Sequence, residues 1–260
     1  PTRRSSDLNY LQHRKVDVVS SALDFILPFE KYKITAGAKV SFTNTRNGIN
    51  YDTSDPTLVQ DDYFRYKEQI YALYADYSRE FSERFSMQLG LRMEHTRTTG
   101  ISEAKDTEDK HDYTRLFPTV YLLYSPTDGH ALNFSFSNRI SRPSQNMVNP
   151  FPFYQNKYTY ACGREDLKPS YTYNAELGYT LKNNFNVSAY YSYSDDVFFQ
   201  VVDLDAETNV TSFLWENFMQ THAFGLNNSY TFRTKWLQTY AQHGVSYRRT
   251  TSSEIGRASC

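Results

Sequence analysis

The feature that most constrains the fold is a strict alternation of apolar and polar side chains. Between Phe85 and Thr96 the chain reads FSMQLGLRMEHT, and the odd-numbered positions from Phe85 to Met93 are all apolar. The even-numbered positions between them carry polar side chains or glycine. Because successive side chains of a β-strand point to opposite faces of a sheet, this segment is predicted to be a strand with one apolar and one polar face.

The same alternation returns along most of the chain. Clear copies lie at 32–43, 132–137, 171–181 and 185–194, and weaker ones near 16–27, 66–78, 113–124, 219–232 and 237–249. We therefore expect about ten strands, and no stretch shows sustained helical periodicity. A pairing error of one residue would move every apolar side chain to the wrong face, so the register of these strands is strongly specified.

The predicted connections alternate between short and long. Short ones lie at 28–31, 79–84, 125–130, 182–184 and 233–235, and long ones at 45–65, 100–112, 142–170 and 203–211. Tight turns at one end and long loops at the other are typical of an antiparallel transmembrane β-barrel, whose turns face the periplasm. The core of a soluble β-sandwich also produces alternation, so that fold stays open as an alternative.

Composition agrees with a barrel. Aromatic residues make up 17% of the chain, with 23 Tyr and 18 Phe, and many flank the short turns, as in an interfacial girdle. The mean hydropathy of -0.67 is compatible with a bilayer because only alternate residues of a barrel strand touch lipid. No apolar run approaches the roughly 18 residues of a membrane helix, so a helical membrane protein is excluded.

Charged side chains can be used to assign the two faces. A Lys or Arg on the lipid side near mid-membrane costs about 2–4 kcal/mol, so the lipid face should be nearly free of charge. Lys39, Arg92, Glu94 and Glu176 all fall on the polar face of their strands. A net charge of -1 implies no basic surface for nucleic acid.

Both ends of the chain carry segments that we expect to be artefacts. Arg4–Leu8 (RSSDL) and Glu254–Ser259 (EIGRAS) resemble translations of a sequencing-adapter oligonucleotide. We therefore set aside 1–8 and 253–260 and treat 9–252 as one partial barrel domain. Cys162 is then the single cysteine, and one cysteine cannot form an internal disulfide.

The central part of the chain resembles a known family. The motifs are LFP at Leu116–Pro118, RISRP at Arg139–Pro143, NPF at Asn149–Phe151, and LKP leading into YNAELGY at Leu167–Tyr179. They resemble the barrel of TonB-dependent outer-membrane receptors, and most closely the Bacteroidota outer-membrane β-barrel family. The family often has Asn-Pro after the glycine and Glu after LKP, where this chain has Arg164-Glu165 and Ser170.

The resemblance implies properties that periodicity does not show. It implies a location in the outer membrane, a complete barrel of 22 strands of which this chain would form about ten, and a plug domain in the lumen. Barrels of that size hold a plug. It also implies uptake of a nutrient ligand energised by the TonB complex through the plug, and leaves room for a surface lipoprotein partner.

Several residues are candidates for structural or binding roles. Pro118 removes a ladder donor, so a bulge or an edge-like position is expected there. Arg139 and Arg142 lie where a strand enters the longest loop, and are expected to hold that loop or line the lumen. Exposed aromatic rings on an outer loop can stack on sugars or aromatic chelates, and packing of the loop on itself is the alternative. The ligand-contact candidates are Phe153, Tyr154, Tyr158 and Tyr160.

No catalytic or metal site is predicted. The acidic group at 195–207 lacks the glycine and closing glutamate of an EF-hand loop and is read as a solvated hairpin tip. Glu94 with His95, and His111 with Asp112, cannot chelate as pairs because adjacent side chains of a strand point to opposite faces. No nucleophile triad, HExxH helix or phosphate loop is present, so we expect neither an enzyme nor a cofactor.

The leading functional hypothesis is a receptor that takes up a scarce nutrient across the outer membrane, such as a siderophore, cobalamin, a glycan or a peptide. A passive porin or an outer-membrane adhesin shares every periodic feature and is the first alternative. A soluble carbohydrate-binding β-sandwich is the second. The sequence does not identify the ligand, because specificity would lie in irregular loops.

Overall fold

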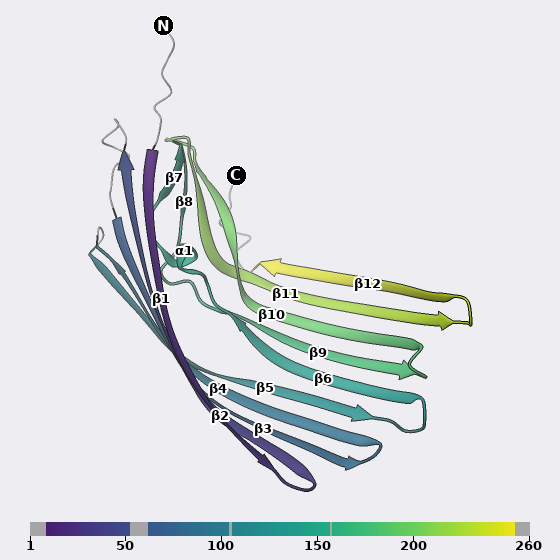
Figure 1. The fold of residues 1–260 in the computed structure, drawn as a ribbon. Coiled ribbons are helices and arrows are strands. Elements are labelled where there is room, and N and C mark those ends of the chain that lie inside the picture. Colours follow the sequence, from purple (N-terminus) through teal and green to yellow (C-terminus); the bar gives the residue numbers. More distant parts are fainter. Residues whose placement is uncertain (1–8, 53–61, 104–105, 157, 253–260) are drawn as a thin grey trace.

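The computed structural model describes residues 9–52, 62–103, 106–156 and 158–252. They form one curved sheet that opens on one side like a trough (Figure 1). The neighbouring strands run β1-β2-β3-β4-β5-β6-β9-β10-β11, with β12 beside β11, and the long strands pair antiparallel. A single sheet is not a β-sandwich, so the predicted fold class, a partial antiparallel barrel, is confirmed.

Ten long strands build the sheet, as the alternation predicted. They are β1 (Asn9–Pro28), β2 (Tyr32–Asp52), β3 (Asp62–Ser82), β4 (Phe85–Ser102), β5 (Thr107–Tyr124), β6 (His130–Ser141), β9 (Ser170–Leu181), β10 (Phe185–Asp205), β11 (Val210–Arg233) and β12 (Gln238–Ser252). Three short elements lie in the connection between β6 and β9, and the sequence did not predict them. They are α1 (Gln145–Val148), β7 (Phe153–Asn156) and β8 (Thr159–Cys162).

Three of the four predicted long loops are largely strand, which corrects the sequence interpretation. β2 continues to Asp52 and β4 to Ser102, and β10 and β11 are separated only by 206–209. Alternation fades in these segments because polar side chains stand on both faces once a strand leaves lipid. Among the connections that the structure describes, only the one from Arg142 to Pro169 is long and mostly irregular.

The register confirms the predicted faces. On the outward face Leu73 of β3 lies between Ala38 and Met93, and Met93 pairs with Leu116. Large apolar side chains on this face remain open to the surroundings, with Leu73 and Leu116 more than half exposed. Outward apolar positions cover about ten residues per strand, or about 33 Å of strand, which at the usual tilt spans the ~25 Å apolar band of a barrel.

Aromatic rings surround the short-turn end of this band. Phe29 stacks on Tyr32 with ring centroids 4.5 Å apart, and the Phe81 and Phe85 centroids lie 5.4 Å apart. Phe85 in turn meets Tyr124 across β4 and β5 at 6.5 Å. Amphipathic rings at this level match an interfacial girdle. In the residues that the structure describes, no helix is long and apolar enough to cross a membrane.

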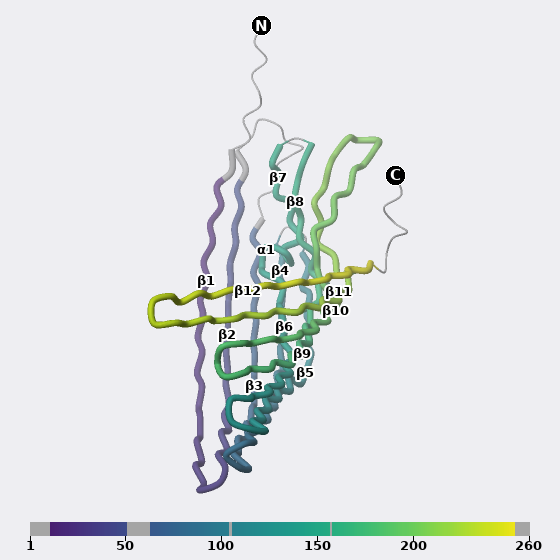
Figure 2. Tube along the Cα trace, turned by 90° about the vertical axis from the view of Figure 1, so that its right-hand side faces the viewer, coloured from purple at the N-terminus to yellow at the C-terminus, as the bar shows by residue number. Residues whose placement is uncertain are grey.

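The buried core lies where the 142–169 connection folds onto the inner face of the trough. Phe64 of β3 packs with Val148 and Leu167, and Ile49 of β2 packs with Phe151. β8 adds four residues in parallel to the edge of β11 between Thr211 and Leu214. Figures 1 and 2 show α1, β7 and β8 between the upper ends of β1–β4 and of β10–β11. We call residues 142–169 the inner loop.

β10 and β11 bend sharply near their middle (Figure 1). The pairing register shifts between Ser194 and Phe198, and Asp196 has a φ of 51°. An extra residue in one strand bends it and increases its twist, which explains the change in direction. The bend turns the upper halves of both strands toward the inner loop.

Candidate lumenal site

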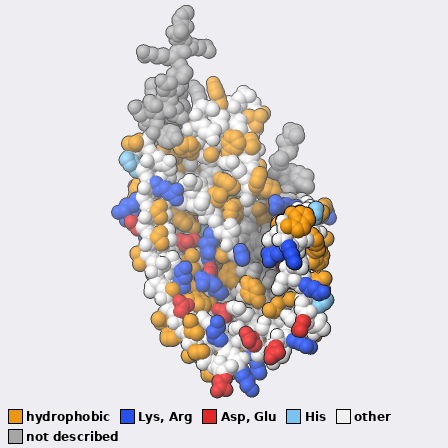
Figure 3. All heavy atoms as spheres, turned by 45° about the vertical axis from the view of Figure 1, so that its right-hand side comes forward, with side chains coloured by type: hydrophobic (Ala, Val, Ile, Leu, Met, Phe, Trp, Pro, Cys, Tyr) orange, Lys and Arg blue, Asp and Glu red, His pale blue; other side chains and the backbone are white. Residues whose placement is uncertain are grey.

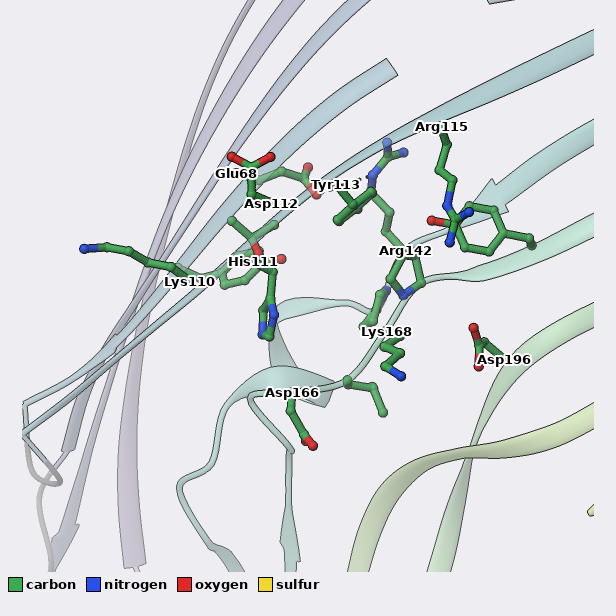
Figure 4. A pocket seen from close by; sticks show the side chains of 16 residues that line it. Glu68, Lys110, His111, Asp112, Tyr113, Arg115, Arg142, Asp166, Lys168 and Asp196 are labelled. Carbon is green, nitrogen blue, oxygen red and sulfur yellow. Dashed lines mark ion pairs between the residues drawn. The ribbon is translucent and has the colours of Figure 1, made fainter. Parts of the chain in front are cut away.

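A polar cavity of about 390 Å³ lies under the inner loop, above the apolar band (Figure 4). Its walls come from β3, β4, β5, the inner loop, the start of β9 and β10. Figure 3 shows Lys, Arg, Asp and Glu side chains gathered within the hollow of the molecule. The cavity is thus built from the polar faces of the strands that the sequence assigned to the lumen.

The cavity exists because β5 and β6 separate. β5 pairs with β4 over its whole length, but with β6 only from Thr119 to Tyr124. Pro118 is the residue at which the pairing with β6 ends, and the register with β4 passes through it without a shift. A proline removes one ladder donor at this point. The inner loop covers part of the open edge, where His111 Nε2 lies 3.0 Å from the carbonyl oxygen of Glu165.

Arg142 is the centre of the polar network in this cavity. Its Nη2 donates to Glu94 Oε2 at 2.6 Å and to Thr96 Oγ1 at 3.1 Å. Its Nε lies 3.8 Å from Glu68 Oε2. Arg92 Nε donates to the other Glu94 oxygen at 2.5 Å. A single guanidinium from the loop therefore joins two carboxylates on neighbouring strands.

Burial shapes the electrostatics of this group. Burial raises the pKa of Glu68, a change that Arg142 opposes and Glu94 reinforces. Burial, together with the Glu68 carboxylate, raises the pKa of Tyr66, and burial also raises the pKa of Tyr113. Burial works against the charge of Arg142, but its hydrogen bonds and charge interactions with Glu94 and Tyr113 together outweigh burial and raise the pKa, so the guanidinium stays protonated.

Charges of both signs line the rest of the cavity. Arg115 lies over the ring of Tyr171 at 4.8 Å, a cation–π contact. Lys168 forms no ion pair with any residue that the structure describes, whereas Lys110 points away from Arg142 and pairs with Glu108 at 3.0 Å (Figure 4). Such a site can bind a polar ligand that carries both hydrogen-bond acceptors and positive groups.

The inner loop is also tied to β11 by charge. Arg164 pairs with Asp166 at 2.7 Å and with Glu216 of β11 at 3.0 Å. The hydrogen bond from Arg164 holds the pKa of Asp166 below its usual range. In the described part of the chain no group of three His, Cys, Asp or Glu side chains could hold a metal ion.

Comparison with known proteins places the chain in a family. The model of the "Outer membrane protein beta-barrel family" matches residues 2–258. The chain belongs to this family. It is therefore an outer-membrane protein, as the apolar outward face and polar inner face require. No curated protein matches it in sequence.

Solved structures share the fold of this outer-membrane barrel. The copper transporter OprC superposes with a TM-score of 0.68 at 13% identity, over 94% of this chain and 39% of OprC. The unliganded ferric citrate transporter FecA gives 0.59 at 13% identity, over 95% and 37%. The ferric yersiniabactin uptake receptor FyuA from Yersinia pestis gives 0.57 at 16% identity, over 94% and 37%. The chain thus spans less than two fifths of each of these proteins.

The two arginines predicted from the sequence lie at different depths on the inner face of the trough. Arg142 enters the cavity under the inner loop. Arg139 is exposed, pairs with Thr172 across β6 and β9, and lines a second cavity of about 510 Å³ on the same inner face. Glu94 also lines this lower cavity, so the Arg142 network lies between the two spaces.

The four aromatic candidates lie on β7, β8 and the turn between them, outside the main cavity. Phe153 and Tyr154 pack against the Ile49–Phe151 cluster. The rings of Tyr154 and Tyr160 are 5.5 Å apart, and Tyr158 is exposed. The structure therefore brings the four residues together on one hairpin but does not bring them to Arg142.

The sequence did not identify Glu68, Tyr66, Tyr113 or His111 as site residues. Each occupies a lumen-facing position of its strand, and that position was the available signal. The sequence does not indicate which inner-loop residue contacts these strands, because such contacts join residues far apart in the chain. Arg142, for example, lies 48 residues from its partner Glu94.

Proposed function

We propose that this barrel segment belongs to an outer-membrane receptor that imports a scarce nutrient, driven by the TonB complex through a plug domain. The observation that carries the proposal is the inner loop, which folds over the concave face and encloses a polar cavity above the apolar band. A passive pore needs an open lumen, whereas a receptor needs a site that holds its ligand until transport begins.

The fold likeness supports the same function. The similar structures are a copper transporter, a ferric citrate transporter and a ferric yersiniabactin uptake receptor. For this chain we propose a ligand of the same general kind: polar, too large for passive pores, and bound by the cavity groups Arg115, Arg142 and Lys168. Binding and release then involve no chemical step.

We assign the β7–β8 hairpin a role at the entrance. Tyr158 is exposed and Tyr160 is partly exposed, so both rings can contact a ligand before it reaches the cavity. Phe153 and Tyr154 support them from below through the Ile49–Phe151 cluster. A surface lipoprotein would act at the same end of the barrel.

Two measurements on the full-length protein test the proposal. In planar bilayers the protein should show no steady conductance without an energy source, and a permanently open pore would identify a passive porin instead. In cells, accumulation of labelled ferric siderophores or cobalamin should depend on both this protein and TonB. Uptake that continues without TonB would overturn the proposal.

A further inference from the structure

We propose that the outward face of β1–β5 carries a binding site for a lipid whose head group bears phosphate, in the outer leaflet of the membrane. The site consists of six cationic side chains, which we call the outer basic patch: Lys15, Arg46, Arg65, Lys67, Arg97 and Lys110. Strand register puts these side chains on the face opposite the lumenal cavity, and Lys110 also contributes atoms to the wall of that cavity. The proposal depends on the membrane location of the barrel and not on the uptake function.

Strand register places these cations on the lipid side. Within β3, Arg65, Lys67 and Leu73 are separated by even numbers of residues, so their side chains lie on the same face. Arg46 of β2 pairs directly with Arg65, and Gln69 pairs with Arg97 of β4. Because side chains alternate along a strand, all of these groups share the outward face.

The patch begins where the apolar band ends. Moving up β4 on this face, Leu91 and Met93 are followed by His95 and then Arg97. Two residues of a strand advance about 7 Å, so three successive outward positions, from the level of Arg97 to that of Arg65, span about 14 Å. This span lies just above the apolar band. This is the level of lipid head groups.

Neighbouring acids neutralise only the flanks of the patch. Asp17 lies 3.3 Å from Arg46 and 3.8 Å from Lys15. Asp112 lies 3.1 Å from Arg97, and Glu108 lies 3.0 Å from Lys110. Among the described residues, these are the only three acids that the pairing register places on the outward face beside the six cations. The patch therefore has twice as many cations as acids.

The centre of the patch has no counter-charge. Arg65 and Lys67 form no ion pair with the residues that the structure describes. Arg46 stands directly opposite Arg65, an arrangement of like charges that destabilises a sheet. The Nε atoms of both arginines are buried and have no hydrogen-bond acceptor in the described structure. Two guanidinium groups side by side, of which only Arg46 has an acidic partner among the described residues, form a site for an oxyanion.

A lipid phosphate fits this position better than a free anion. The apolar residues directly below the patch are open to acyl chains, with Leu73 and Leu91 about half exposed. A molecule with a phosphorylated head and several acyl chains can satisfy both surfaces at once, and cations at a membrane surface attract anionic lipid. Free phosphate would use only the upper part.

The test uses the full-length protein in detergent and a synthetic glycolipid of the lipid A type, with and without its phosphates. Binding is measured by native mass spectrometry. The variant is Arg65→Gln with Lys67→Gln. The control is Lys33→Gln with Lys39→Gln, which removes the same charge from the lumen face of β2. Lys67→Gln alone replaces the double variant if that protein does not fold.

We expect the phosphorylated lipid to bind saturably to the wild type and the control. Removing two cations should weaken binding about 25-fold, at roughly fivefold per charge, and Lys67→Gln alone about fivefold. Equal binding of the dephosphorylated lipid would overturn the proposal, as would an equal loss in the control. Complete displacement of the lipid by millimolar inorganic phosphate would show a free-phosphate site and would also overturn it.

Discussion

Arg142 is the residue on which the attachment of the inner loop depends most. It is the first residue after β6, and its guanidinium reaches two carboxylates on β3 and β4. Glu94 keeps a second partner in Arg92, but Arg142 is the only cation within 4 Å of Glu68 among the described residues. Loss of Arg142 would therefore leave a half-buried carboxylate without compensation.

The first prediction concerns Arg142→Met in the full-length protein. Removing one partner of a largely buried ion pair costs on the order of 3 kcal/mol, so backbone amides at 144–152 and 163–169 should exchange hydrogen about a hundredfold faster. Arg139→Met is the matched control, because that exposed arginine forms no described ion pair. Exchange that rises equally in both variants would show that Arg142 does not hold the loop. Adding Glu68→Gln to Arg142→Met should restore part of the protection.

Among the structural elements, the inner loop is held as much by close backbone contact as by charge. The N–H of Gly163 donates to the carbonyl oxygen of Asn149 at 2.7 Å, and that of Arg164 to Met147 at 2.8 Å. A Cβ at Gly163 would stand 2.4 Å from the Asn149 oxygen and 2.6 Å from the Met147 oxygen. Only glycine therefore lets the end of β8 dock against α1.

The second prediction is that Gly163→Ala loosens this docking. Overpacking against backbone costs about 1–3 kcal/mol, so trypsin should cleave after Arg164 roughly ten times faster in the folded full-length protein. Gly244→Ala on β12 serves as the control, since its nearest neighbour is the flexible end of Asn227. Unchanged cleavage in the Gly163 variant would mean that the loop tolerates the added methyl group.

The ten long strands could be predicted from sequence because lipid on one side and water on the other impose a period of two on every membrane-spanning strand. That cause disappears above the membrane, where β2, β4 and β10 continue as paired strands without a readable pattern. The inner loop could not be predicted because its shape depends on contacts such as Val148 with Phe64, which lie far apart in sequence. For the same reason, the sequence indicated Arg142 as a candidate site residue but did not indicate its partner Glu68.

At the scale of the whole molecule, the decisive feature is that the sheet has two open edges. In the described structure β1 pairs only with β2, and β12 pairs only with β11. Each edge presents unpaired backbone N–H and C=O groups, which cost several kcal/mol apiece in hydrocarbon. Figure 1 shows that the trough leaves these edges apart, so further strands have to join them before the lumen is enclosed.

The last prediction follows from these edges. The isolated chain of residues 9–252, refolded with lipid vesicles, should not become a protected membrane protein, because its edges cannot be satisfied by lipid. Proteinase K should digest it throughout, and it should migrate in gels equally with and without heating. The full-length protein under the same conditions should keep its strands protected and migrate differently when unheated, as a closed barrel does. Protection of the isolated segment as a monomer would mean that β1 and β12 pair with each other, and the trough would then be a small barrel in its own right.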